Sequence, residues 1–142
     1  FMIFNTKFEA DKPAKPLCGQ CEKCLDKCPT KAITEPFVIN SQLCIAYHTI
    51  ENRDLNLPSI IEKNLNGWIA GCDICQDICP WNKFVPTNKN IDTHPKQWME
   101  KINLDSLKWK DHEWSENLKG TTLKRIKPWM WRRNIKASIQ KR

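Results

Sequence analysis

The sequence predicts an α+β fold in which a small cysteine-rich domain with a short sheet is followed by a helical C-terminal arm. Three observations lead to this prediction. The 142-residue chain contains eight cysteines, an unusual number for a domain of this size. Strand character is confined to a short central segment. The last part of the chain is a run of aromatic and basic residues with helical signals.

We expect three segments. Residues 1–16 are interpreted as the tail of a preceding domain and a linker, with the end of a strand at 1–8 and a proline-containing linker at 12–16. Residues 17–86 form the cysteine-rich domain, and residues 87–142 form a loop and a basic helical arm. Because the chain begins with Phe1, we expect it to be part of a longer protein.

The elements between and after the cysteine groups follow from apolar spacing and from proline. Residues 36–43 have strand character. Residues 59–69, directly after Pro58, have the apolar spacing of a helix. In the arm, Asp105 or Ser106 is expected to cap one helix, and Thr121 or Thr122 a second one. Pro128 predicts a kink or break just before it, because proline cannot continue a helix.

The first cysteine group has the spacing Cys-x2-Cys-x2-Cys-x3-Cys-Pro, from Cys18 to Pro29. This is the bacterial ferredoxin signature for [4Fe–4S] clusters, whose fourth cysteine serves the other cluster in two-cluster proteins. Three thiolates two residues apart let one loop wrap three corners of a cubane. Gly19 suits a loop that approaches the cluster closely. The motif therefore predicts iron–sulfur chemistry.

A second group, Cys72-x2-Cys75-x3-Cys79-Pro80, is one cysteine short, and Cys44 stands alone between the groups. By analogy with the crossed ferredoxin arrangement, we expect two ligand sets and therefore a ferredoxin-like domain with two [4Fe–4S] clusters. The first set is Cys18, Cys21, Cys24 and Cys79. The second set is Cys28, Cys44, Cys72 and Cys75.

Disulfides and structural zinc are the alternatives for the cysteines. The sequence has no apolar run long enough to span a membrane, and its start lacks the features of a signal peptide, so we expect a cytoplasmic protein. A reducing compartment disfavours disulfides. Zinc sites favour two separated cysteine pairs rather than a tight triplet followed by Cys-Pro. Iron–sulfur clusters are therefore the favoured interpretation.

Residues 28–33, 44–51 and 67–82 resemble epoxyqueuosine reductase, and the resemblance covers about residues 1–135. It implies a cytoplasmic oxidoreductase that uses cobalamin and two [4Fe–4S] clusters to convert epoxyqueuosine to queuosine at the tRNA wobble position. The clusters would relay electrons to the cobalamin, which carries the chemistry. Most of the cobalamin site lies in the family's N-terminal domain, so we name no catalytic residue and expect this chain alone to be inactive.

The resemblance also implies partners and cofactor contacts. The partners are a tRNA anticodon stem-loop and a small electron donor such as ferredoxin or flavodoxin, and the protein is expected to be a monomer without membrane contact. Tyr47, Thr49, Glu51 and Asp73 are candidates to face cobalamin. Alternatively, Thr49 and Glu51 form an N-capping pair, Tyr47 packs on a cluster, and Asp73 binds loop amides. His48 is interpreted as a helix-face residue rather than a corrin contact.

The end of the chain is strongly basic, with nine Lys and Arg and no Asp or Glu from 117 to 142. Interleaved cations and aromatics suit phosphate contacts and stacking on unpaired bases. The candidate RNA-binding residues are Lys124, Arg125, Lys127, Arg132 and Arg133. The alternative is an amphipathic helix whose Trp129, Met130 and Ile135 pack on the body while its cations lie in water.

Two other functions are compatible with parts of the pattern. A free-standing two-cluster ferredoxin would carry electrons without being an enzyme, and it would give no role to the basic arm. A zinc-binding nucleic-acid module would explain the arm but would be colourless, unlike an iron–sulfur protein. The family resemblance favours the iron–sulfur part of the reductase.

Overall fold

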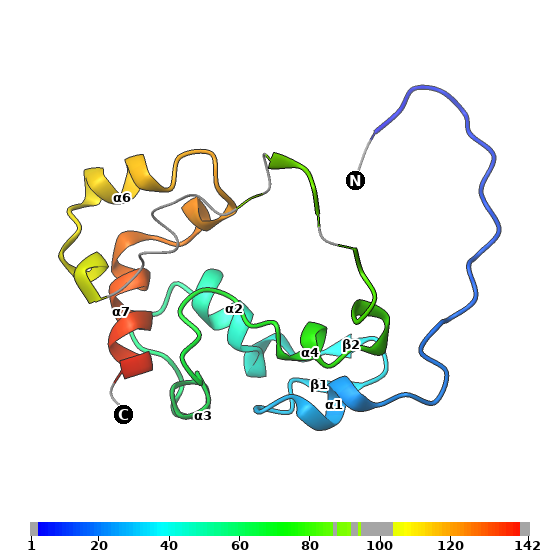
Figure 1. The fold of residues 1–142 in the computed structure, drawn as a ribbon, viewed down its shortest axis with the longest axis horizontal. Helices are drawn as coiled ribbons and strands as arrows, with labels where there is room; N and C mark the ends of the chain where they lie inside the picture. The colour runs from blue at the N-terminus through cyan, green and yellow to red at the C-terminus, as the bar shows by residue number, and fades with distance from the viewer. Residues whose placement is uncertain (1–2, 87, 92–93, 95–103, 140–142) are drawn as a thin grey trace.

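The computed structural model describes residues 3–86, 88–91, 94 and 104–139 of the chain. The described residues form two lobes (Figure 1). The cysteine lobe, residues 17–44 and 72–86, holds α1 (Lys23–Lys27), β1 (Ile33–Glu35), β2 (Val38–Ile39), η1 (Ser41–Leu43), α4 (Ile74–Asp77) and η2 (Pro80–Asn82). The helical lobe holds α3 (Ser59–Lys63), η4 (Leu104–Lys108), α6 (Asp111–Asn117), η5 (Thr122–Arg125) and α7 (Pro128–Ile139). Helix α2 (Ile45–Ile50) runs between the lobes.

The sheet is a two-stranded antiparallel hairpin in the cysteine lobe. Ile33 pairs with Ile39 and Glu35 pairs with Val38, with an irregular register between these pairs. Phe37 turns the chain with a positive φ of 68°, which is unusual for a bulky residue. The strand predicted at 36–43 is therefore correct only at 38–39. Residues 41–43 form the 3-10 helix η1, because the Asn40 side chain accepts the Gln42 amide and starts a helical turn.

The helix predicted at 59–69 ends at Lys63 in the structure. Its predicted second half is wrong because Asn66 and Gly67 adopt left-handed φ values of 48° and 86°, which reverse the chain. The apolar spacing nevertheless identified buried residues, since Ile61 and Leu65 are fully buried. The hydrophobic pattern thus marked the face of the segment but not its length.

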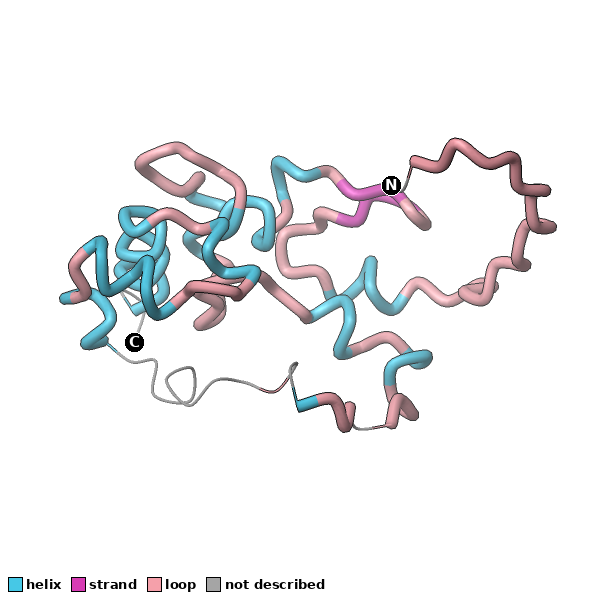
Figure 2. The backbone as a smooth tube through the Cα atoms, turned by 90° about the horizontal axis from the view of Figure 1, so that it is seen from above, coloured by secondary structure: helices cyan, strands magenta, loops and turns pink. Residues whose placement is uncertain are grey.

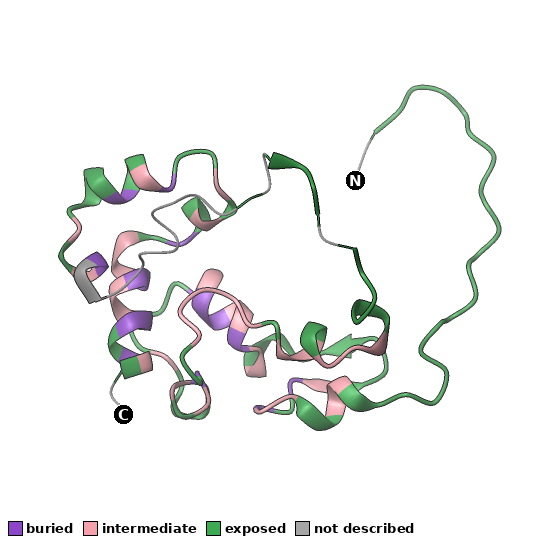
Figure 3. Ribbon diagram, in the orientation of Figure 1, coloured by how far each residue is buried: buried purple, intermediate pink, exposed green. Residues whose placement is uncertain are grey.

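Residues 3–16 are extended, exposed and free of strand structure, so the strand end predicted at 1–8 is wrong over the described residues 3–8. Figure 2 traces this segment as a long loop, and Figure 3 shows it as exposed throughout. It joins the cysteine lobe where the Trp81 indole N–H donates to the Leu17 carbonyl at 3.2 Å. Residues 12–16 are exposed, and their role as a linker stays a prediction.

The core sits around α7, where buried residues are concentrated (Figure 3). One cluster contains Trp114, Leu118, Ile126, Met130, Trp131 and Ile135. A second cluster joins Ala137 of α7 to Ile45, Ile61 and Leu65. The C-terminal segment is therefore not a separate arm. It packs on the residues between the two cysteine groups, across the expected boundary at 86/87.

The break before Pro128 is confirmed, because η5 ends at Arg125 and α7 begins with Pro128 itself. Proline fits there because the first helical N–H has no partner within the helix. Thr121 is at the N-cap of η5, but its hydroxyl donates to the Leu118 carbonyl instead. Asp105 and Ser106 lie inside η4, so the cap predicted there is wrong.

Helix α6 was not predicted, although Glu113 gives it a start signal by accepting the Lys110 amide at 2.7 Å. None of the helices in the described part of the chain has both the length and the apolar character that crossing a membrane requires.

Candidate functional site

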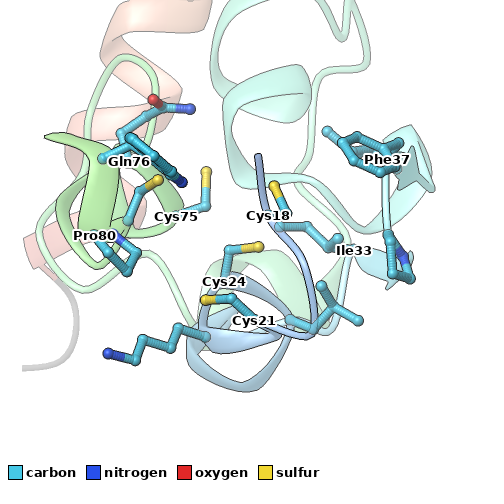
Figure 4. A pocket seen from close by; sticks show the side chains of 14 residues that line it. Cys18, Cys21, Cys24, Ile33, Phe37, Cys75, Gln76 and Pro80 are labelled. Atoms are coloured by element: carbon cyan, nitrogen blue, oxygen red, sulfur yellow. The ribbon is translucent and has the colours of Figure 1, made fainter. Parts of the chain in front are cut away.

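A large cavity of about 490 Å³ lies between α1, the hairpin and α4. Figure 4 shows the side chains of Cys18, Cys21, Cys24 and Cys75 around this space. Cys79 also lines it, together with apolar side chains that include Ile33, Phe37 and Trp81. The structure thus brings together all four members of the first predicted ligand set.

A second, smaller cavity of about 50 Å³ is lined by Cys28, Cys44, Cys72 and Cys75. These are the four members of the second predicted set. Cys75 lines both cavities, so the two spaces adjoin each other. The assignment of each thiolate to one cluster stays a prediction, but the grouping of the cysteines in space follows the grouping expected from the motif.

The cysteine chemistry suits iron–sulfur clusters. All eight cysteines are free thiols in the structure, and no disulfide joins them. Each of the two cavities is lined by the four thiols expected to bind one cubane. The grouping of the thiols therefore suits two clusters.

The thiols of the second cavity influence one another. Burial raises the pKa of Cys72, and the neighbouring Cys75, Cys44 and Cys28 raise it further. Burial also raises the pKa of Cys75, with added repulsion from Cys44 and Cys24. Thiolates that line one small cavity repel one another, and a cationic core offsets that repulsion. The residues present therefore fit a cluster with a positively charged core.

Cys28 is the exception among these thiols. Burial acts to raise its pKa, but hydrogen bonds to its sulfur outweigh burial, and the pKa of Cys28 is lowered. The Ala32 amide donates to the Cys28 sulfur at 3.2 Å, and the Thr30 hydroxyl lies 3.7 Å from it. Thr30 is itself buried. These donors stabilise negative charge on this sulfur, so Thr30 is a functional candidate that the sequence did not reveal.

Turns and helix ends position the cysteines. Cys28 caps the C-terminal end of α1, and Cys44 occupies the N-cap of α2. Gly19 has a φ of +54°, as expected for the loop of the first motif, and Gly71 has a φ of +84° immediately before Cys72. Glycine adopts these values without strain. The backbone can therefore turn sharply beside the thiols.

The four candidate cobalamin contacts differ in exposure. Thr49 is fully buried, and its hydroxyl donates to the Ile45 carbonyl at 2.8 Å and accepts the Gly71 amide at 3.0 Å. The N-capping pair considered for Thr49 and Glu51 is wrong, because both lie at the C-terminal end of α2. Glu51 instead forms an ion pair with Arg125.

Tyr47 is half-buried and meets the His48 ring edge-on at 5.1 Å, and Asp73 is exposed at the start of α4 without a side-chain cap. The cobalamin contact predicted for Tyr47, Thr49, Glu51 and Asp73 stays a prediction. For Thr49, the side chain offers no exposed atom to such a contact in this chain.

His48 has the structural role expected of a helix-face residue. It is buried, its Nε2 lies 2.8 Å from the Gln42 carbonyl, and its Nδ1 lies 2.9 Å from the Asn52 amide nitrogen. The Asn52 amide donates to Nδ1, and Nε2 in turn donates to the Gln42 carbonyl. Both ring nitrogens are thus used inside the chain.

The candidate RNA-binding residues divide into two groups. Arg132 donates to the Trp109 carbonyl at 2.7 Å and to Asp111 at 2.8 Å. Arg133 donates to the carbonyls of His48 at 2.7 Å and Asn52 at 3.2 Å, and to that of Asp54. Burial lowers the pKa of Arg133, whereas the charge of Asp54 acts to raise it. These two arginines therefore have structural partners.

Lys124, Arg125 and Lys127 are exposed, and Arg125 is paired with Glu51. The packing expected in the amphipathic alternative is present, because Met130 and Ile135 are buried and Trp129 packs against the same cluster. The expectation that all the cations lie in water is wrong for Arg132 and Arg133. RNA contact by any of the five residues stays a prediction.

Three comparisons with known proteins each find proteins similar to this chain. Residues 17–82 match the family model described as a 4Fe-4S double cluster binding domain. An epoxyqueuosine reductase of Prochlorococcus marinus is 58% identical over 142 residues, which are 99% of this chain and 46% of that protein. A crystal structure of selenomethionine-labelled epoxyqueuosine reductase has a TM-score of 0.84 and 30% identity over 92% of this chain and 35% of that one.

A further crystal structure, of an epoxyqueuosine reductase with an epoxyqueuosine-modified tRNA-Tyr stem loop, has a TM-score of 0.78 and 30% identity. The similarity again covers 92% of this chain and 35% of that chain. The chain thus spans about half the length of the curated relatives it matches.

Proposed function

We propose that this chain, which is 58% identical to an epoxyqueuosine reductase over 142 residues, belongs to that family and is the iron–sulfur electron-relay part of an oxidoreductase that converts epoxyqueuosine to queuosine at the tRNA wobble position. One observation carries this proposal. The eight cysteines surround two adjoining cavities, and Cys75 lines both of them. Two adjoining redox centres are what a relay of single electrons requires.

In this proposal the domain is ferredoxin-like and holds two [4Fe–4S] clusters. Cys18, Cys21, Cys24 and Cys79 bind the first cluster, and Cys28, Cys44, Cys72 and Cys75 bind the second. When bound, each cluster accepts and returns one electron. The chain orients the thiolates, and the Ala32 amide donates a hydrogen bond to the Cys28 sulfur. With every iron bound by a thiolate, substrate reduction takes place elsewhere.

Cobalamin, bound mainly by residues outside this chain, supplies the chemistry at the substrate in this proposal. Tyr47, Glu51 and Asp73 are the candidate contacts toward it. A small ferredoxin or flavodoxin delivers the electrons, and the protein acts as a cytoplasmic monomer. The tRNA anticodon stem-loop contacts the exposed cations Lys124, Arg125 and Lys127. The relative crystallised with a tRNA stem loop supports a tRNA substrate.

A free-standing ferredoxin-type carrier explains less of the chain. The similarity to the reductases extends over 99% of the sequence, including the whole helical lobe, whereas a carrier needs only the cysteine lobe. The helical lobe also supplies most of the apolar core. The relay within a larger reductase is therefore the better supported function.

A chimaera tests the proposal. This chain would replace the matching segment of the Prochlorococcus marinus reductase, and the purified chimaera would be analysed anaerobically for iron, labile sulfide and conversion of an epoxyqueuosine-containing stem-loop RNA. We expect about eight irons and eight sulfides per protein and formation of queuosine. The control is Cys72→Ser in the chimaera, which should lose iron and activity together. Zinc in place of iron, or an iron-loaded chimaera that forms no queuosine, would contradict the proposal.

A further inference from the structure

Two chain segments connect the helical lobe to the second cavity. Helix α2 carries Cys44 at its N-cap, and residues 69–71 lead directly into Cys72. Figure 1 shows α2 and the chain leading into α4 running along each other between the lobes. The Thr49 hydroxyl of α2 accepts the Gly71 amide at 3.0 Å, which joins the two segments beside Cys72. Both cysteines therefore sit at the ends of connected segments.

Asn134 of α7 holds the same two segments. Its side-chain amide donates to the Thr49 carbonyl at 2.8 Å and to the Ile69 carbonyl at 2.8 Å. Its side-chain oxygen accepts the Arg133 guanidinium at 3.1 Å, which fixes the orientation of the amide. Asn134 is fully buried, so no water can replace these bonds. A polar residue in this place is costly unless every one of its bonds is made.

We propose that Asn134 and Thr49 are positioning residues for the second iron–sulfur site, because together they set the separation of the segments that carry Cys44 and Cys72. This inference rests on the proposed function, since it assumes that the second cavity holds a cluster. Groups outside the ligand shell that orient the ligands tune a metal site. The C-terminal helix therefore acts on the redox properties of a site to which it contributes no ligand.

The two residues can be changed without changing the ligands. Thr49→Val has the same shape but lacks the hydroxyl that accepts the Gly71 amide, whereas Thr49→Ser keeps a hydroxyl. Asn134→Leu removes both donated hydrogen bonds at similar volume. Ser106→Ala is the matched control for loss of a buried hydrogen bond, because Ser106 accepts the Trp131 indole N–H at 3.1 Å within the helical lobe.

The experiment uses the reductase chimaera described above and follows each variant by EPR-monitored redox titration, iron content and thermal unfolding. Thr49→Val and Asn134→Leu should shift the midpoint potential and the g-values of one cluster, and this should be the cluster lost in Cys72→Ser. Thr49→Ser should restore the native signal. Ser106→Ala should lower the Tm and leave both clusters unchanged.

Unchanged potentials and g-values in Thr49→Val would overturn the inference, and this variant keeps the test open if Asn134→Leu fails to fold. A Thr49→Ser protein with the same shift as Thr49→Val would also overturn it, because the hydroxyl would then not be the cause. The iron and sulfide content of the unsubstituted chimaera tests the proposed function separately. Two intact clusters there, with no shift in the variants, would overturn only the inference about positioning.

Discussion

The two lobes are stabilised in different ways. The helical lobe has an apolar core of large side chains, among them Trp114, Leu118 and Trp131. In the cysteine lobe, Ala32 is the one hydrophobic residue that is buried among the described residues of 17–44 and 72–86. A lobe this small without an apolar core needs another source of stability. The comparison indicates that the cysteine lobe depends on what its cysteines bind, whereas the helical lobe does not.

Removal of the proposed clusters should have the largest effect, and it should destabilise the cysteine lobe more than the helical lobe. We expect chelation of iron to unfold the cysteine lobe, because in small metal-binding domains the free energy of metal binding is also folding free energy. Hydrogen exchange should accelerate at least about 100-fold at residues 18–44 and 72–82, while α7 stays protected. Equal loss of protection in both lobes would show that they fold as one unit, and an unchanged cysteine lobe would contradict its dependence on metal.

Removal of a large core side chain addresses the helical lobe. Trp131 is buried between Trp114, whose ring centre is 4.8 Å away, and the rest of the core. Trp131→Ala should lower the free energy of unfolding by about 3–5 kcal/mol, because it leaves a cavity and removes a hydrogen bond to Ser106. Chemical denaturation followed by circular dichroism measures this change. Ile139→Ala, at an exposed site in the same helix, should cost less than about 1 kcal/mol.

The surface charges of the helical lobe can be tested apart from its core. Lys124→Glu with Lys127→Glu should weaken binding of an anticodon stem-loop RNA and reduce the salt dependence of log Kd by about two, one for each phosphate contact. Both side chains are exposed, so the Tm should not change. Fluorescence anisotropy at several salt concentrations measures the binding.

The control for this RNA prediction is Lys12→Glu with Lys15→Glu, which makes the same charge change in the exposed N-terminal segment. Equal weakening by both pairs would indicate a general charge effect rather than a contact. Charge reversal of Arg132 or Arg133 is unsuitable as a test, because both donate to backbone carbonyls inside the protein.

The smallest expected effect concerns the cysteine lobe again. Thr30→Val should lower the midpoint potential of the second site by about 20–60 mV, the equivalent of one hydrogen bond of about 1 kcal/mol for a single electron. The direction follows because a hydrogen bond to the Cys28 sulfur favours the more negative, reduced state. EPR-monitored titration measures it. Thr34→Val, on the exposed face of β1, should change neither potential, and a higher potential in Thr30→Val would contradict the assignment.

The grouping of the cysteines was accessible from the sequence, because the ferredoxin motif itself indicates that the last cysteine of a group serves the other cluster. The break at Pro128 was predicted for a similar reason, since one residue determines it. The early end of α3 was missed, although Asn66 and Gly67 are residues that favour a left-handed turn. The apolar spacing of this segment continues through the turn at Asn66 and Gly67, and it therefore predicts a longer helix than the structure contains.

The carbonyl partners of Arg133 and Asn134 could not be predicted, because they lie 65 to 85 positions away in the sequence. The partner of His48 depends on a neighbouring loop. A signal for Asn134 was present, since it lies between Trp131 and Ile135 on the apolar face of α7. A polar residue on such a face suggests a buried hydrogen bond. It does not tell which carbonyls are the partners, since that depends on packing between the lobes.

The position of Cys75 in the wall of both cavities has a consequence for how the protein matures. In the proposed two-cluster protein, insertion of a cluster into either site should immobilise α4, which carries Cys75, and so lower the conformational-entropy cost of ordering the other site. Filling of the sites should therefore be cooperative. Newly made chains should be mostly empty or fully loaded, with few carrying a single cluster, and oxidative loss of one cluster should hasten loss of its neighbour.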